Sequence, residues 1–224
     1  MFTGIVEAVG RIAAVEMTQG DMRLRVQAGT LDLSDVKLGD SIATNGVCLT
    51  VTGLTGDGFW ADVSRETLAH TRFGTLSVGE AVNLEKAMMP TSRFGGHIVT
   101  GHVDGIGEVV ERRDDARSIR LRVRAPSALA RYIAGKGSVT VDGVSLTVNA
   151  VDGAEFELNI VPHTAAETVI AGYGAGSPVH LEVDIVARYL ERLLQFGSQS
   201  PAGEAADDGG LTLAKLNEYG FSRR

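Results

Sequence analysis

The sequence predicts an all-β protein in which two similar small barrels follow one another and a helix closes the chain. Three observations predict this. The chain matches itself at a constant offset of 97 residues, from residue 3 to residue 85. Both copies are filled by short segments of alternating, often β-branched side chains. After the second copy, apolar residues fall at helical spacing, at Val186, Tyr189, Leu190, Leu193 and Leu194.

The internal repeat defines the domains. The matching segments share residue identity and spacing: Thr3-Gly4 with Thr100-Gly101, RLRV at 23–26 with 120–123, and SIATNGVCLTV at 41–51 with SVTVDGVSLTV at 138–148. Two copies of this length are two domains and not a solenoid, which needs at least three smaller repeats. We expect the first barrel at residues 1–97 and the second at 98–184, with a boundary in the turn-rich segment 86–97.

Within each copy we expect short strands and two brief helices. In the first copy the strands lie at 24–26, 47–51, 59–63 and 81–84, separated by Gly and Asp turns. The helices are expected at 31–36 and 64–71, with counterparts at 127–133 and 163–170, and Ser127 is expected to cap its helix. Closing the strands into a barrel would leave no exposed sheet edge.

The end of the chain belongs to neither copy. An amphipathic helix is expected at residues 185–197, ending at Gly197. Its apolar face would pack either on a barrel or on another subunit, and periodicity alone does not decide between them. Residues 198–224 are expected to be a flexible tail, with a weak last helix at 211–219.

Composition excludes several classes of function. The net charge of −7 disfavours nucleic-acid binding, which needs clustered Lys and Arg. Cys48 is the only cysteine, so neither an intrachain disulfide nor a cysteine-rich zinc cage can form within one chain. There is no long apolar run and no secretory leader pattern. We therefore expect a cytoplasmic protein that binds a small molecule, with no membrane partner.

The repeated strand G-V-(Cys/Ser)-L-T-V carries the first candidate site. Side chains alternate along a strand, so Cys48 and Thr50 share a face, as do Ser145 and Thr147. These small polar residues could simply fill a tapering barrel. They could instead form a hydrogen-bonding site for a planar polar heterocycle. Both interpretations remain open at this point.

Other candidates lie beside the domain junction and before the second polar strand. His97 and His102 are five residues apart in an extended segment, so they point to opposite faces and no shared metal is expected. His102 could carry protons or could satisfy backbone groups at a turn. Lys136 and Asp142, which replaces Asn45 of the first copy, have ordinary explanations as a solvated cation and a turn residue.

Four motifs in order on a duplicated chain carry a family resemblance. MFTGIV at 1–6, NGVCLTV at 45–51, GGHIVTGHV at 95–103 and DGVSLTV at 142–148 resemble the riboflavin synthase α-chain family, over about residues 1–196. The resemblance implies two six-stranded Greek-key barrels plus a C-terminal helix, a homotrimer formed through that helix, and a further association with lumazine synthase. It also implies that two molecules of 6,7-dimethyl-8-ribityllumazine exchange a four-carbon unit, giving riboflavin and 5-amino-6-(D-ribitylamino)uracil, without metal or cofactor.

The resemblance also implies which residues form the sites. The first barrel would use residues 4–6, 48–50 and 62–67, with 101–103 beside it. The second would use 145–147 and 159–164, with Lys136 reaching across an interface. The expected substrate-binding residues are Phe2, Gly4, Ile5, Val6, Cys48, Leu49, Thr50, Asp62, Val63, Ser64, Thr67, Gly101, His102, Val103, Lys136, Ser145, Leu146, Thr147, Asn159, Ile160, Val161, Pro162, His163 and Thr164. The expected catalytic residues are Cys48, His102, Ser145, Thr147, Ser41 and Asp142.

Two other functions remain as alternatives. The first is a non-catalytic lumazine-binding carrier on the same duplicated barrel, which would keep only one binding barrel. The second is a metal- or flavin-dependent oxidoreductase on a small barrel. Both copies here keep the polar pair of the repeated strand, which favours catalysis over the carrier.

Overall fold

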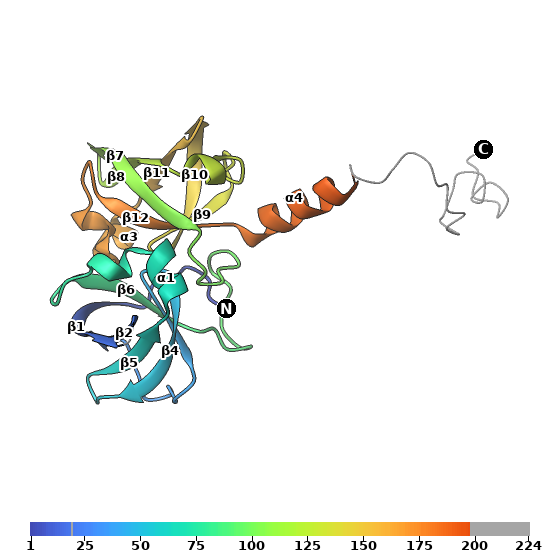
Figure 1. Ribbon diagram of the computed structural model, residues 1–224. Coiled ribbons are helices and arrows are strands. Elements are labelled where there is room, and N and C mark those ends of the chain that lie inside the picture. The colour runs from blue at the N-terminus through green and yellow to red at the C-terminus, as the bar shows by residue number, and fades with distance from the viewer. Residues whose placement is uncertain (19, 198–224) are drawn as a thin grey trace, which may run out of the picture. The chain divides into compact units, whose positions relative to one another are not determined.

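The computed structural model describes residues 1–18 and 20–197 (Figure 1). Residues 1–188 form one compact unit, which holds both barrels, and residues 189–197 are the described part of a second unit. The expected tail and its weak helix lie outside the described residues.

Each copy of the repeat forms a closed barrel of six antiparallel strands. The first barrel has the strand order β1-β2-β5-β4-β3-β6, and the second has the matching order β7-β8-β11-β10-β9-β12. The strands of the first are β1 Ala8–Thr18, β2 Asp21–Gln27, β3 Ser41–Thr44, β4 Val47–Leu54, β5 Gly58–Val63 and β6 Ala81–Lys86. Those of the second are β7 Gly105–Asp115, β8 Ser118–Arg124, β9 Ser138–Val141, β10 Val144–Asp152, β11 Glu155–Ile160 and β12 Pro178–Val183. The predicted pair of barrels is confirmed.

The repeat extends to the irregularities of the sheets. The register of β1 on β2 shifts between Ile12 and Ala14, and that of β7 on β8 shifts between Val109 and Glu111, at the matching positions. Such bulges bend and twist a strand, which helps a sheet to close. The two copies are therefore the same fold in detail.

The hairpins β3–β4 and β9–β10 meet at their tips. Their turns are Asn45-Gly46 and Asp142-Gly143, and all four residues have positive φ, as a two-residue type I′ hairpin requires. A Cβ on Gly46 would lie 2.7 Å from the backbone nitrogen of Gly143, and the reverse holds for Gly143. Only glycine lets the two barrels touch here.

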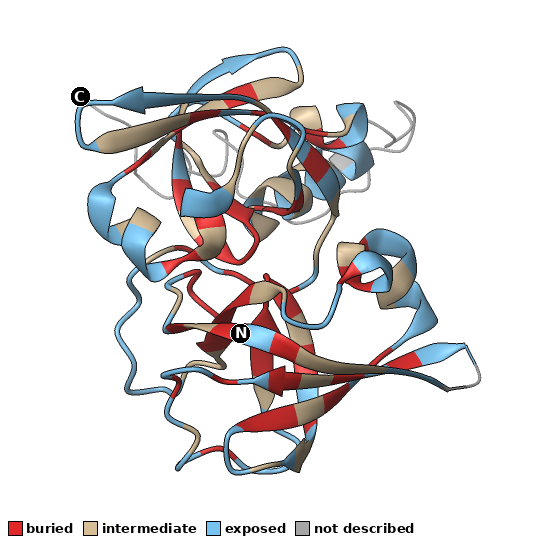
Figure 2. Cartoon of the chain, turned by 90° about the vertical axis from the view of Figure 1, so that its left-hand side faces the viewer, coloured by how far each residue is buried: buried red, intermediate tan, exposed pale blue. Residues whose placement is uncertain are grey.

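Each barrel has its own apolar core, visible as the buried stretches along the strands in Figure 2. Phe59 and Phe156 occupy equivalent positions and are fully buried. Burying a side chain of this size contributes about 1.5 to 3 kcal/mol. A third, smaller cluster consists of Phe2, Ala43 and Val99, with Cys48 packed against it, and Phe2 and Val99 pair through two backbone hydrogen bonds.

The helices follow the expectation with two corrections. α1 Arg65–His70 begins at Ser64, whose hydroxyl accepts a hydrogen bond from the Thr67 amide. α3 Pro162–Glu167 begins with proline, and the 3₁₀ turns η1 Arg72–Thr75 and η2 Val169–Gly172 follow the two helices. The expected helix at 31–36 is wrong. There the Asp32 carboxylate accepts from the Ser34 amide and favours a turn.

The second correction concerns α2, which spans only Ser127–Ala130. Its N-cap is Pro126, and no side chain caps the helix, so the expected capping by Ser127 is wrong. Ser127 is already the first helical residue, one position too late to act as the cap.

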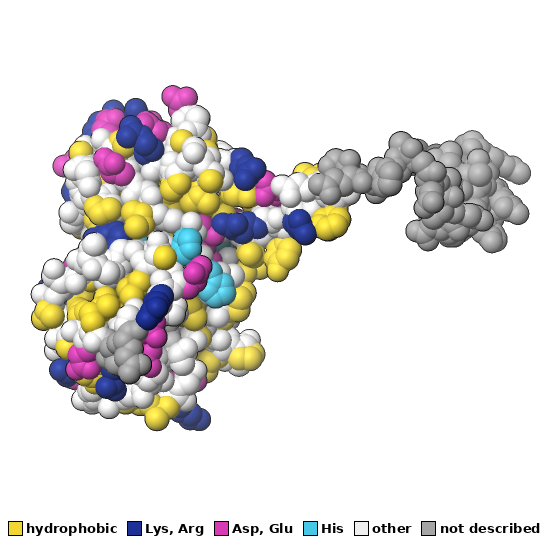
Figure 3. Space-filling view, viewed as in Figure 1, with side chains coloured by type: hydrophobic (Ala, Val, Ile, Leu, Met, Phe, Trp, Pro, Cys, Tyr) yellow, Lys and Arg dark blue, Asp and Glu magenta, His cyan; other side chains and the backbone are white. Residues whose placement is uncertain are grey.

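The C-terminal helix α4 Ile185–Gly197 is confirmed. In the first unit, Arg188 pairs with Asp104 and lies 5.2 Å above the Tyr132 ring. In the second unit the helix carries exposed large apolar side chains, coloured yellow in Figure 3: Tyr189, Leu190, Leu193, Leu194 and Phe196. Within the part of the chain that the structure describes, no helix is both long and apolar enough to cross a membrane.

Candidate functional site

The polar pair of the repeated strand lies on the outside of each barrel. Along β4 the burial alternates, with Val47, Leu49 and Val51 in the core and Cys48 and Thr50 on the outer face. Along β10 the same alternation puts Ser145 and Thr147 outside. The interpretation that these residues fill the barrel is therefore wrong. We call the outer faces around β4 and β10 the first site and the second site.

Each site is completed by a segment that belongs to the other copy of the repeat. The first crossing segment, residues 3–6, passes over β10, where the Ser145 amide donates to the Gly4 carbonyl at 2.8 Å. The second crossing segment, residues 100–103, passes over β4, where the Cys48 amide donates to the Gly101 carbonyl at 2.8 Å. The two segments thus exchange barrels.

Only glycine permits this crossing. Gly4 and Gly101 have φ of +76° and +79°, which disfavours any other residue. A Cβ on Gly4 would lie 2.6 Å from the Cβ of Ser145, and one on Gly101 would lie 2.6 Å from the Cβ of Cys48. The backbone therefore lies directly on the polar strand in both sites.

A buried glutamate fixes each crossing segment to its own barrel. Glu85 accepts hydrogen bonds from the Thr3 amide and hydroxyl and from the Gly4 amide, at 2.7, 3.0 and 3.0 Å. Glu182 makes the same three bonds to Thr100 and Gly101, at 2.6, 2.7 and 3.0 Å. Burial raises the pKa of both carboxyls, and the accepted hydrogen bonds oppose that rise.

The exchange corrects the expected membership of the sites. Residues 4–6 belong to the second site and not to the first, since Val6 packs against the core of the second barrel. Residues 101–103 belong to the first site, since Val103 packs against the core of the first barrel. The neighbouring strands add Asp62 of β5 and Asn159 of β11, which lie on the outer faces beside β4 and β10.

Lys136 stands at an unusual backbone position beside the second site. Its φ is +67°, and the equivalent residue of the first copy is Gly39, with φ of +93°. Its amide donates to the Val148 carbonyl at 2.7 Å, at the end of the polar part of β10. The left-handed conformation costs a lysine roughly 1 kcal/mol, a cost that the glycine of the first copy does not have.

The two histidines of the junction differ in burial. His102 is exposed on the second crossing segment, within the first site. His97 is buried, and its Nδ1 lies 2.7 Å from the Ser145 hydroxyl. They do not share a ligand set, and within residues 1–18 and 20–197 no three His, Cys, Asp or Glu side chains are grouped to hold a metal.

Comparisons with known proteins agree with this geometry. The lumazine binding domain matches twice, at residues 3–87 and 100–184. Riboflavin synthases of Photobacterium phosphoreum and Photobacterium leiognathi are 60% and 47% identical to this chain, covering 87% and 99% of it and 89% and 99% of their own length. The chain belongs to the riboflavin synthase family.

Solved structures share the fold of this family. LumP complexed with 6,7-dimethyl-8-(1'-D-ribityl) lumazine has a TM-score of 0.74 at 24% identity, and LumP complexed with riboflavin has a TM-score of 0.76 at 25% identity. Each match covers 82% of this chain and 99% of the LumP chain. The twin-barrel fold of the riboflavin synthase family is therefore shared with a ligand-binding relative.

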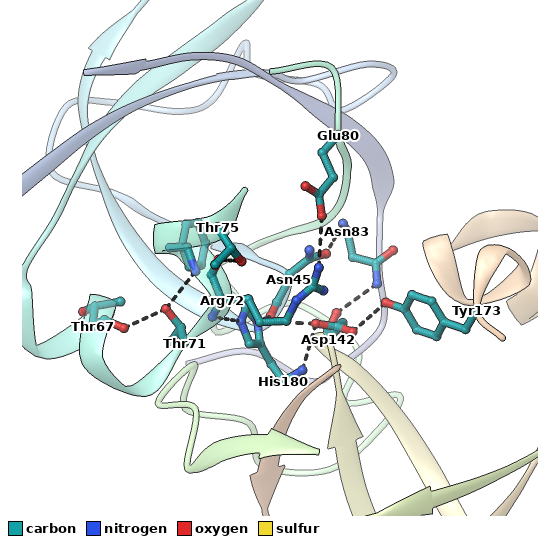
Figure 4. A network of polar contacts seen from close by, with 11 residues as sticks. Asn45, Thr67, Thr71, Arg72, Thr75, Glu80, Asn83, Asp142, Tyr173 and His180 are labelled. Carbon is teal, nitrogen blue, oxygen red and sulfur yellow. Dashed lines mark hydrogen bonds and ion pairs between the residues drawn. The ribbon is translucent and has the colours of Figure 1, made fainter. Parts of the chain in front are cut away.

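Asp142, expected from the family resemblance to be catalytic, is fully buried between the barrels (Figure 4). The Tyr173 hydroxyl donates to it at 2.5 Å and the His180 amide at 3.0 Å. Burial raises the pKa of Asp142, while the hydrogen bonds donated by the Tyr173 hydroxyl and the His180 amide lower it. Burial and the nearby Asp142 charge also raise the pKa of Tyr173. With no exposed surface, Asp142 cannot contact a substrate, so the geometry does not support a direct catalytic role.

The same network contains a histidine that replaces an asparagine of the first copy. Asn83 donates through Nδ2 to the Asp142 carbonyl and accepts from the Val169 amide through Oδ1. At the equivalent position His180 places Nδ1 2.9 Å from the Asn45 carbonyl, and its Nε2 accepts from the Arg72 amide at 2.8 Å. A neutral imidazole with hydrogen on Nδ1 reproduces both bonds of the amide. Sequence reasoning missed His180, although the constant offset pairs it with Asn83.

Ser41 lies at the edge of the first site. It is half-buried and is the register partner of Thr50 across β3 and β4. It also borders a hollow of about 560 Å³, whose lining includes Thr3, Glu85 and Lys86. Cys48 and Thr50 are not part of that lining, so the hollow adjoins the polar strand and is not the strand's own face.

Proposed function

We propose that this chain is a riboflavin synthase, which converts two molecules of 6,7-dimethyl-8-ribityllumazine into riboflavin and 5-amino-6-(D-ribitylamino)uracil. One observation carries the proposal: the chain holds the same composite site twice. Each site has an outward polar strand and a crossing segment held by a buried glutamate. Two sites of the same shape suit a reaction between two identical substrates.

The shape of the sites supports a reaction between facing ligands. Both polar strands lie on outer faces, so a bound planar ring would keep one side uncovered. A second ring held by another such face could cover it. Holding two reactants face to face can lower the barrier by about 7 to 11 kcal/mol without any cofactor.

The polar groups of each site fit a heterocycle with amide-like edges. The first site offers Cys48, Thr50, Ser41, Asp62 and the residues of the second crossing segment. The second offers Ser145, Thr147, Asn159, Lys136 and the residues of the first crossing segment. In this proposal residues 62–67 and 159–164 shape the surroundings of the rings. Phe2, expected to bind substrate, is fully buried and paired with Val99, so its side chain supports the fold and does not contact the ligand. Short side chains and backbone groups are the donors and acceptors that orient such ligands.

The chemistry requires only modest residues. The C7 methyl of the lumazine loses a proton readily, because the resulting anion is delocalised into the ring. One lumazine then donates a four-carbon unit to the other. The exposed His102 is a proton carrier in the first site in this proposal, since an imidazole nitrogen can accept a proton and donate it again.

The proposal extends to assembly and location. The exposed apolar side chains of α4 suit an interface between subunits, and a homotrimer through this helix would bring the first site of one subunit toward the second site of its neighbour. Light scattering of the purified protein tests the trimer. A cytoplasmic location and an association with lumazine synthase stay part of the proposal.

The decisive experiment uses the purified protein and the lumazine alone. We expect riboflavin to appear, with two lumazines consumed for each riboflavin formed, and two ligands bound per chain at equilibrium. Lumazine binding without turnover would contradict the proposed enzyme activity and favour a non-catalytic carrier. Metal analysis and an absorption spectrum of the purified protein test the alternative of a metal- or flavin-dependent oxidoreductase. A bound flavin alone would not support that alternative, because riboflavin is the expected product.

A further inference from the structure

The second site contains a hydrogen-bonded histidine and serine that the first site lacks. His97 Nδ1 lies 2.7 Å from the Ser145 hydroxyl, which stands on the polar face of β10. The other ring nitrogen, Nε2, lies 3.3 Å from the Thr140 hydroxyl on the neighbouring strand β9. Imidazole next to a hydroxyl is the arrangement by which enzymes remove a proton from that hydroxyl.

The imidazole is held firmly in this position. His97 is 8% exposed and Thr140 is 1% exposed. The His97 amide donates to the Thr3 carbonyl at 3.1 Å, which ties it to the first crossing segment. A Cβ on Gly96 would lie 2.0 Å from the Thr3 carbonyl oxygen and 2.8 Å from the Cβ of Ser145, so only glycine lets the chain approach this closely.

The equivalent positions of the first site have different chemistry. Cys48 replaces Ser145 and Ala43 replaces Thr140. Among the residues that the structure describes, no side chain hydrogen bonds to the Cys48 thiol. The relay of imidazole and hydroxyls therefore belongs to the second site.

We propose that His97 takes up the proton of the Ser145 hydroxyl, which makes Ser145 the group that removes a proton from the ligand in the second site. This inference rests on the proposed function. A C–H bond of the C7 methyl breaks, its electron pair stays on the ligand as a ring-delocalised anion, and its proton goes to Ser145 Oγ. The serine's own proton goes to His97 Nδ1. The imidazolium keeps its Nε2 hydrogen directed at Thr140. When the products form, the proton on His97 Nδ1 returns to Ser145, and the Ser145 hydroxyl returns its proton to the reacting ligands.

The electrostatic surroundings keep the imidazole in its basic form. Burial lowers the pKa of His97, and the Asp184 carboxylate opposes this. Two further carboxylates lie on the neighbouring elements and are held by their own hydrogen bonds: Glu182, the register partner of Thr140, is bonded to Thr100 and Gly101, and Glu85 is bonded to Thr3. At neutral pH the neutral His97 can therefore accept a proton from Ser145.

The first experiment replaces His97→Asn in the full-length protein. The amide keeps a hydrogen bond to Ser145 but cannot take a proton. We expect the turnover rate to fall by about 100-fold, as for loss of a general base, and the acid limb of its pH profile to disappear. Lumazine affinity should change by less than about threefold, because the hydrogen bond is kept. The matched control is His70→Asn, an exposed histidine of α1 outside the proposed sites, with the wild-type rate and pH profile expected.

A double-mutant cycle tests whether His97 acts through Ser145. In a Ser145→Ala background, His97→Asn should cause no further loss of turnover. Equal losses in both backgrounds, or a wild-type pH profile in the single variant, would overturn the proposal. If the wild type itself makes no riboflavin, the proposed function fails, and the following measurement still decides the role of His97.

A thiol reporter keeps the test independent of turnover and of the folding of His97 variants. Ser145→Cys is made in a Cys48→Ser background, so that the introduced thiol is the only one in the chain. A thiol beside an accepting imidazole is converted to the reactive thiolate at lower pH. At about pH 6.5 we expect iodoacetamide to modify it at least about tenfold faster than Cys48 of the wild type. Equal rates would show that His97 does not accept the proton.

Discussion

The two barrels have the same strand order and the same bulges, yet they differ where ligand would bind. The parts that agree are structural: the Thr-Gly pair of each crossing segment, its buried glutamate, and the threonine of the polar strand. The two copies differ at many positions, and several of these lie at the sites or at the turn between the barrels. They include the changes from the first copy to the second of Cys48 to Ser145, Ala43 to Thr140, Gly39 to Lys136, Asn45 to Asp142 and Asn83 to His180.

The fold and the chemistry of the two barrels therefore have separate requirements. A crossing segment needs glycine and glutamate in both barrels because the geometry is the same. The polar groups around the ligand are free to diverge, since they do not close the barrel. The two sites are therefore alike in shape but unequal in chemistry, and we expect them to treat their ligands differently.

The largest effect should come from the crossing glycines. Gly4→Ala should destroy the second site and Gly101→Ala the first, because each added Cβ collides with the polar strand of the opposite barrel. Misplacing a site by about 1 Å can cost roughly 100-fold in rate, so we expect at least that loss of turnover. Equilibrium titration should fall from two ligands per chain to one. If Gly4→Ala instead removed binding at the first barrel, the exchange of segments would be wrong.

The next effect concerns the backbone position of Lys136. Lys136→Gly should raise the free energy of unfolding by about 1 kcal/mol, because glycine adopts the left-handed conformation without strain. Turnover should fall by on the order of tenfold through loss of a charged hydrogen bond to the ligand. Urea unfolding measures the change in the free energy of unfolding, and steady-state kinetics measure the change in turnover. The matched control, Gly39→Lys, should destabilise the first barrel by a similar amount. A more active Lys136→Gly variant would contradict the assignment.

A smaller effect should appear in the pH dependence of stability. Because burial raises the pKa of Asp142, the folded chain binds that proton more tightly than the unfolded chain. Asp142 therefore stabilises the fold below its unfolded pKa, and this stability is lost as the pH rises through the folded pKa. The slope is at most about 1.4 kcal/mol per pH unit for one proton.

Asp142→Asn should remove that slope while leaving ligand binding intact, since the amide can still accept from the His180 amide. Urea unfolding at a series of pH values between about 4 and 8 measures the slope. The matched control is Asn45→Asp, which should add a similar slope at the equivalent turn. An unchanged slope in Asp142→Asn would show that this carboxyl does not titrate differently in the two states.

The smallest effect should come from making the first polar strand like the second. Cys48→Ser should keep most of the turnover, because a hydroxyl occupies the equivalent position in the second barrel. Cys48→Ala should lower turnover by about fivefold, the loss of one ordinary hydrogen bond to the ligand. Steady-state rates of both variants measure this. Full turnover in Cys48→Ala would refute a role for the thiol.

Much of the fold could be read from the sequence because its signals are local or periodic. The constant offset predicts two equal domains, alternation places Cys48 and Thr50 on one face, and Asn45-Gly46 is a hairpin turn. The helix expected at 31–36 failed for a local reason as well, since Asp32 competes for a backbone amide.

The site was harder to predict because it depends on contacts across the repeat. Nothing near Gly4 in the sequence reveals that its carbonyl accepts from the Ser145 amide, so residues 4–6 were assigned to the wrong barrel. The burial of Asp142 likewise depends on Tyr173 and His180 of other strands and turns. One signal lies in the sequence itself: the constant offset pairs Lys136 with Gly39, and glycine is the residue that most readily adopts the positive φ that the structure shows at both positions.

The exchange of crossing segments has a consequence for how such a chain could arise. A single copy of the repeat carries a crossing segment that fits another barrel, and it lacks the segment that would complete its own binding face. Such a copy could complete that face only in a dimer in which the two copies exchange their crossing segments. Fusion of the two copies places both segments in one polypeptide, and each half can then diverge without losing its partner.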